Sequence, residues 1–145
     1  MGLLLKKIRS EYMEQYNYRA AFEPKTEKLY VKKFRKTYKD KWLATEQAIL
    51  DVCKRIDNML QYSRADLISS VGSYKLVKLD FAVVGTQMSP KSSGNRCILF
   101  VDEDIRAVKI LLVYSKSDIT SSNETQWWKT IVKNEYGEIW ELFER

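Results

Sequence analysis

Two cationic residues, Arg96 and Lys116, lie at the outer ends of two apolar segments that can pair as a hairpin. The segments are separated by the charged turn at 103–106, a spacing typical of a hairpin with a four-residue loop. Antiparallel pairing brings the start of the first strand to the end of the second, so Arg96 and Lys116 are expected to converge. An arginine fork beside a mobile lysine charge is chemistry suited to a phosphate group.

Each of these cations also has a structural interpretation. Arg96 could form an ion pair at the edge of the sheet, and Lys116 could pair with Asp118. The sequence leaves both interpretations open beside the phosphate site.

The chain contains no histidine. This excludes Ser-His and Cys-His catalysis, imidazole zinc sites and the usual general base of neutral pH. Any chemistry must therefore use Lys, Arg, Tyr, Asp or Glu, and we expect neither a metal nor a cofactor. Cys53 and Cys97 lie in a predicted helix and a predicted strand, outside any C-x-x-C pair, which favours buried, reduced thiols.

Positive charge is concentrated between residues 25 and 41, where bases outnumber acids by six, as many as the net charge of the whole chain. From residue 102 onward the chain is net negative. A cluster of this density predicts contact with RNA phosphates, although a solvated helix face is the other interpretation. The candidate contacts are Lys32, Lys33, Arg35 and Lys36.

Hydrophobic periodicity predicts helices over 3–20, from Thr26 or Glu27 to about residue 38, and over 45–62, with Thr45 as a candidate N-cap. Residues 63–73 are predicted to form a loop, 74–81 a strand and 85–94 a polar loop before the hairpin. The S-x-x-E spacing of Ser121 and Glu124 predicts a capping box for a last helix, which we expect to end near Gly137.

This order predicts an α+β fold in which N-terminal helices pack on a small, mainly antiparallel sheet that is followed by a C-terminal helix. A further short strand could lie within residues 22–31. The 145 residues fit a single domain, and no apolar run is long enough to span a bilayer or to form a signal peptide, so we expect a cytoplasmic protein without membrane contact.

The pattern of elements and motifs resembles a known family. Ser-Ser-Gly-x-Arg opens one strand at 92–96, an acidic turn follows, and the next strand ends in Tyr-Ser-Lys-Ser-Asp at 114–118. In this order of motifs, residues 28–135 resemble the RelE/ParE superfamily of toxins from bacterial type II toxin-antitoxin systems. Residues 1–22 would then form an extra N-terminal helix. The resemblance implies a RelE-like fold and a cognate antitoxin. The RelE branch cuts mRNA on the ribosome without metal, and the ParE branch inhibits gyrase.

The resemblance also implies roles for individual residues. Arg96 matches the arginine that contacts the scissile phosphate, and Lys116 matches a basic residue at the end of the last strand. The paired lysines of the family correspond to Lys75 and Lys78, which lie on opposite faces of the predicted strand. We favour Lys78 for catalysis because it shares its face with Asp80, whereas the face of Lys75 is apolar.

The catalytic tyrosine of RelE-like members has no match here; Tyr114 is a candidate substitute, with a place in the core as the alternative. Lys91, in the long loop before Arg96, is a further candidate RNA contact, although the loop could be a tolerated surface insertion. Trp127 and Trp128 fit a core better than a base-stacking platform. Apolar residues at 139–143 suggest packing on the N-terminal helix or a partner surface.

The sequence therefore predicts a toxin that acts as a ribosome-dependent mRNA endoribonuclease and inhibits translation, with the ribosome, mRNA and an antitoxin as partners. The alternatives are a non-enzymatic RNA-binding or protein-interaction module on the same fold, or a gyrase inhibitor of the ParE type.

Overall fold

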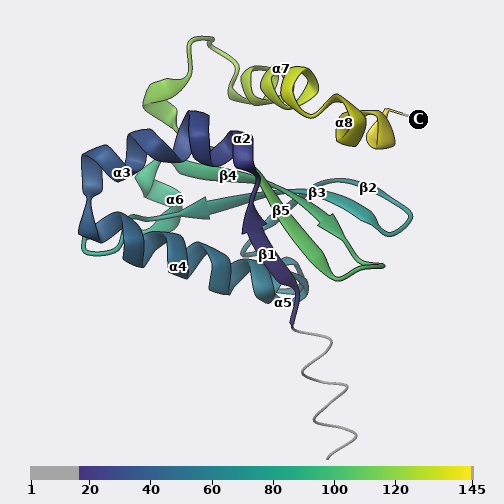
Figure 1. Cartoon of the computed structure of the whole chain (residues 1–145), viewed down its shortest axis with the longest axis horizontal. Helices are drawn as coiled ribbons and strands as arrows, with labels where there is room; N and C mark the ends of the chain where they lie inside the picture. Colours follow the sequence, from purple (N-terminus) through teal and green to yellow (C-terminus); the bar gives the residue numbers. More distant parts are fainter. Residues whose placement is uncertain (1–16, 145) are drawn as a thin grey trace, which may run out of the picture.

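A computed structural model describes residues 17–144 of the chain (Figure 1). The helix expected over 3–20 lies mostly outside these residues, and its last part is wrong because Arg19–Phe22 form strand β1. The elements follow in the order β1 (Arg19–Phe22), α2 (Pro24–Thr26), the π-helical turn η1 (Glu27–Val31), α3 (Lys32–Tyr38), α4 (Asp40–Lys54), α5 (Ile56–Gln61), β2 (Asp66–Val71), β3 (Tyr74–Phe81), α6 (Pro90–Ser93), β4 (Asn95–Asp102), β5 (Ala107–Ser115), the 3-10 turn η2 (Lys116–Asp118), α7 (Glu124–Glu135) and α8 (Gly137–Phe143).

The five strands form one mixed sheet in the order β1-β5-β4-β3-β2. β1 runs parallel to β5, and the other neighbouring pairs are antiparallel. This confirms the α+β class and the mainly antiparallel sheet. It corrects the loop expected over 63–73, which contains β2, and places the additional strand at β1 rather than within 22–31.

The sheet is covered on both faces (Figure 1). Helices α3 and α4 pack on one face through a core that includes Phe34, Trp42 and Ile49. Helices α7 and α8 pack on the other face, where Trp128 and Val132 meet Leu76, Ile98 and Leu112. Alternation along the central strands β3, β4 and β5 therefore directs their side chains to one of two covered faces, whereas much of the edge strand β2 stays exposed.

The C-terminal residues at 139–143 belong to the core of the second face. Phe143 packs edge-on against Phe100 of β4 with ring centroids 6.1 Å apart. Among the described residues, the apolar side chains at 139–143 therefore help to cover the second face of the sheet. Trp128 is buried in the same core, in agreement with its predicted core position.

The helix ends differ from the predicted ones. The helix expected over 45–62 starts at Asp40 and breaks at Arg55, so Thr45 lies inside α4 rather than at its N-cap. Its hydroxyl donates to the Lys41 carbonyl at 2.7 Å and accepts the backbone N–H of Val84 at 2.8 Å, which ties α4 to the chain after β3.

The cap of α7 also differs from the prediction. The N-cap is Asn123, whose side chain accepts from Gln126 N, so the predicted cap at Ser121 is wrong. α7 ends at Glu135, near Gly137 as predicted, and Gly137 itself begins a further helix, α8. Within residues 17–144 no helix combines the length and the apolar character needed to cross a membrane.

Candidate functional site

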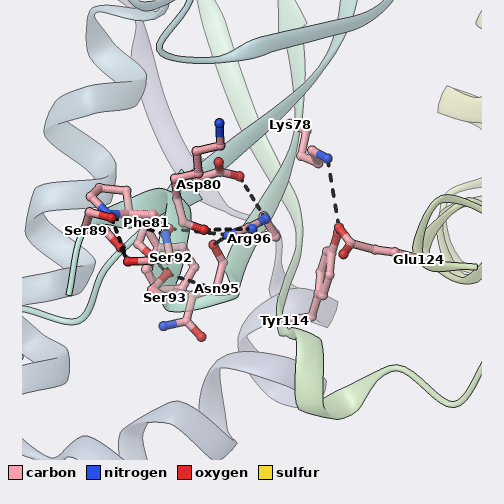
Figure 2. A network of polar contacts seen from close by, with 12 residues as sticks. Lys78, Asp80, Phe81, Ser89, Ser92, Ser93, Asn95, Arg96, Tyr114 and Glu124 are labelled. Carbon is pink, nitrogen blue, oxygen red and sulfur yellow. Dashed lines mark hydrogen bonds and ion pairs between the residues drawn. The ribbon is translucent and has the colours of Figure 1, made fainter. Parts of the chain in front are cut away.

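Arg96 lies near the start of β4, opposite Asp80 of β3 and Tyr114 of β5. Its side chain is almost completely buried, and its Nε lies 2.9 Å from an Asp80 carboxylate oxygen. The two terminal nitrogens donate to the carbonyls of Asn95, Pro90 and Lys91 at 2.9, 3.4 and 3.2 Å (Figure 2). The guanidinium therefore joins β3, β4 and α6 from inside, and the ion pair that was the structural interpretation of Arg96 forms with Asp80.

The hairpin ends do meet, as predicted, but through backbone groups. The backbone N–H of Lys116 donates to the Gly94 carbonyl at 2.9 Å. Gly94 has φ +79 at the end of α6, a left-handed conformation that favours glycine, and a Cβ there would lie 3.6 Å from Lys116 Cβ. The Lys116 side chain is exposed at this junction, while the Arg96 side chain is directed to internal acceptors.

Asp118 does not pair with Lys116 in the structure. Its carboxylate forms an ion pair with Lys33 of α3 and accepts the backbone N–H of Ser115 at 2.9 Å. Asp118 thereby joins α3 to the end of β5. The predicted alternative of a Lys116–Asp118 pair is replaced by this contact.

Lys78 and Tyr114 converge on one carboxylate, that of Glu124 in the first turn of α7 (Figure 2). The Tyr114 hydroxyl donates to Glu124 Oε2 at 2.9 Å, and Lys78 Nζ lies 3.9 Å from the same oxygen. About a quarter of each of the Lys78 and Glu124 side chains is exposed, whereas Tyr114 is fully buried. Lys78, Glu124 and Tyr114 form the group we call the Glu124 cluster.

The electrostatics of the Glu124 cluster keep the phenol protonated. Burial raises the pKa of Tyr114, and the hydrogen bond to the Glu124 carboxylate raises it further. Tyr114 is therefore a fixed hydrogen-bond donor that orients Glu124, and its ring packs 5.1 Å from that of Trp127. Tyr114 thus occupies a place in the core, which was one of its two interpretations, and only its hydroxyl contacts Glu124.

Sequence reasoning named Lys78 as a candidate but not Glu124, which the structure places 3.9 Å from it. Lys78 and Asp80 do share a face, and Lys75 points to the opposite face, where it pairs with Glu103 at 2.9 Å. Glu124 appeared in the sequence only as part of a capping motif. Its contact with β3 and β5 depends on α7 folding back over the sheet. Local sequence patterns do not predict that long-range packing.

The positive helices expose a second group of candidate residues. Lys28, Lys32 and Lys36 follow one another at four-residue spacing from η1 into α3, are all exposed, and form no ion pair within residues 17–144. We call them the lysine ridge. In contrast, Lys33 is held by Asp118, and Arg35 lies 3.1 Å from Glu46 and 3.5 Å from Glu27.

A small recess of about 120 Å³ lies between α3 and the end of the hairpin. Its lining includes Lys33 and Thr37 from α3 and Asn95 and Ser117 from the hairpin ends. Among residues 17–144, no group of three or more His, Cys, Asp or Glu side chains is placed to hold a metal ion.

Comparison with known proteins gives one structural likeness. No family model and no curated protein matches the chain. Among solved structures, the fold is similar to a chain in the crystal structure of the archaeal RelE-RelB complex from Pyrococcus horikoshii OT3. The two share 13% sequence identity, the match covers 71% of this chain and 99% of that chain, and the TM-score is 0.49.

Proposed function

We propose that this chain is a RelE-like toxin that acts on RNA in translation and is neutralised by an antitoxin. The observation that carries the proposal is the lysine ridge of Lys28, Lys32 and Lys36, which presents three unpaired positive charges on one exposed helical segment. Lysines of this kind gain affinity for RNA by releasing counterions from the phosphate backbone. The sequence gives separate support. The Gly94-x-Arg96 motif and the strand leading to Lys116 carry the resemblance to the RelE/ParE superfamily.

The activity that we propose is metal-free cleavage of mRNA at the Glu124 cluster. Such cleavage needs a base for the 2′-hydroxyl, a cation for the crowded phosphorane and a proton for the leaving 5′-oxygen. Glu124 is a carboxylate that can accept the proton of the 2′-hydroxyl. Lys78 beside it is an ammonium that can contact the phosphate and give a proton to the leaving 5′-oxygen. Tyr114 orients Glu124, and Arg96 fixes the strands that carry the cluster.

A non-enzymatic RNA-binding protein on the same fold is the second candidate. One observation favours it: the donors of Arg96 are occupied by Asp80 and three backbone carbonyls, so this arginine has internal partners in place of a substrate phosphate. The two candidates share the lysine ridge and differ only in whether bound RNA is cut.

Regulated expression without an antitoxin tests the proposal. We expect arrested growth and cleavage of translated mRNA, mapped by primer extension, and expect naked RNA to remain largely intact because the ribosome positions the substrate. Glu124→Gln should lower the cleavage rate by about 10²–10⁴-fold, the usual contribution of a general base, while ribosome binding persists. Glu141→Gln, the same change at an exposed position of α8, is a control for expression and folding.

The outcomes separate the candidates. Ribosome binding without cleavage by the wild-type chain would support the non-enzymatic protein. A loss of DNA supercoiling without RNA cleavage would favour gyrase inhibition. Normal growth with abundant soluble protein and no ribosome binding would contradict the proposal as a whole.

A further inference from the structure

A groove with a volume of about 560 Å³ lies between α4, α5, the end of β3 and α6. This size is typical of ligand-binding clefts, and most of its surface is apolar. Its apolar lining comes from Ala48, Ile49, Val52, Met59, Leu79 and Phe81. The groove belongs neither to the Glu124 cluster nor to the lysine ridge, so the following inference concerns binding alone and does not depend on the RNA activity.

Within residues 17–144, the edge of β3 inside this groove has no strand partner. β2 pairs with β3 only as far as the Asp66–Lys78 pair, whereas β3 continues to Phe81 against β4 on its other side. Residues 79–82 line the groove with this edge. The Phe81 carbonyl accepts a hydrogen bond from Ser93 Oγ at 2.6 Å. An open strand edge is a template on which an extended segment can add a further strand.

Two cations at the groove lack partners. Arg64 follows α5 and Lys91 lies in α6, both are exposed, and neither side chain forms an ion pair or hydrogen bond with the rest of residues 17–144. Asp80 is the one acidic residue in the lining, and its carboxylate is paired with Arg96 at 2.9 Å. The groove therefore presents unpaired positive charge to any ligand, which favours an acidic one.

Exposed apolar side chains extend the groove along the chain. Tyr62, Val84 and Met88 are all exposed, and each lies one or two residues from a lining residue. A small ligand inside the cleft would leave these side chains in water. An extended peptide that runs along the strand edge has the length to reach past the cleft toward them.

We propose that this groove binds an extended acidic peptide segment of a partner protein, which adds a strand to the open edge of β3 at residues 79–82. The side chains of an extended segment alternate between two faces, so every second one would be apolar and enter the groove. Carboxylates on the intervening positions would pair with Arg64 and Lys91.

The probe is a fluorescein-labelled seven-residue peptide that alternates glutamate and valine, measured by fluorescence anisotropy with the full chain. We expect saturable binding below 1 mM and about tenfold or weaker binding after Arg64→Glu with Lys91→Glu. Lys28→Glu with Lys36→Glu makes the same charge change on the lysine ridge and should leave affinity within twofold. Ala48→Trp fills the groove from an exposed position of α4 and should also abolish binding, while Ala44→Trp, outside the lining, should not.

Hydrogen exchange tests the strand addition itself. Bound peptide should slow amide exchange within residues 79–82, and a peptide with proline at its centre should bind at least tenfold more weakly because it lacks a backbone donor. A control peptide of the same length alternates lysine and valine and should bind at least tenfold more weakly than the glutamate–valine peptide. The proposal is overturned if this control peptide binds as tightly, if Ala48→Trp binds like wild type, if exchange at 79–82 is unchanged, or if no binding occurs up to 1 mM.

Discussion

At the scale of single residues, Arg96 acts first as a structural cation. It is buried between Asp80 and three carbonyls that would lose their donor on truncation. We therefore expect Arg96→Ala to lower the free energy of unfolding by about 2–4 kcal/mol, measured by urea denaturation. Lys36→Ala, an exposed control, should change it by less than about 0.5 kcal/mol. Equal stability of the two variants would show that the buried contacts of Arg96 contribute nothing.

The two cysteines are buried, and we expect their thiols to be unreactive in the folded protein. Both are inaccessible to solvent, and burial raises the pKa of the Cys53 thiol to about 12 and that of Cys97 well above its ordinary value. We expect iodoacetamide at pH 8 to leave both thiols unmodified in the native protein and to alkylate both in guanidinium, as read by mass spectrometry. Rapid alkylation of the folded chain would contradict this burial.

The same raised pKa has a consequence for stability. A thiol that loses its proton more easily in the unfolded chain stabilises the fold below its ordinary pKa of 9.0, and this contribution is lost as the pH rises toward 12. Cys53→Ala should therefore show a weaker fall of stability between these pH values than wild type.

At the scale of elements, the junction between α3 and α4 depends on Lys39. This residue has φ +48 and ψ −117, a conformation that costs a side chain energy and that glycine adopts freely. We expect Lys39→Gly to raise the free energy of unfolding by about 1 kcal/mol. Lys36→Gly, inside α3, should lower it by about 1 kcal/mol, and a destabilised Lys39→Gly would show that the side chain is needed at the junction.

The elements that the sequence predicted well are those with a clear pattern of apolar residues. β3 and the β4–β5 hairpin alternate or run apolar between turn residues, and the structure confirms them together with the opposite faces of Lys75 and Lys78. β2 was missed because its serines and exposed Leu67 show no apolar face. β1 was missed because it continues a spacing that resembles a helix.

The site was harder to predict than the strands because its contacts are long-range. The burial of Arg96 depends on the carbonyls of α6, in a segment predicted to be a polar loop. The position of Glu124 depends on α7 returning across the sheet. Neither the contact of Arg96 with α6 nor that of Glu124 with the sheet can be predicted from residue types and their local spacing.

At the scale of the whole molecule, charge is distributed unevenly between the N-terminal helices and the C-terminal part of the chain. The positive helices η1 and α3 carry the lysine ridge, whereas the chain from residue 102 onward, including α7 and α8, is net negative. Such asymmetry orients a protein toward a polyanion before contact and raises its association rate. RNA bound by the lysine ridge, as we propose, would therefore approach from the side of α3, next to the recess at Lys33.

The most direct test of RNA recognition is the salt dependence of binding to purified ribosomes. Replacing Lys28, Lys32 and Lys36 with glutamate should weaken binding and make the slope of log affinity against log salt shallower by about 2–3, roughly one unit for each lost phosphate contact. The control variant carries Lys54→Glu, Arg55→Glu and Lys133→Glu, which change the net charge equally at positions outside the lysine ridge and the groove. The account predicts the wild-type slope for the control; equal slopes for both variants would contradict it.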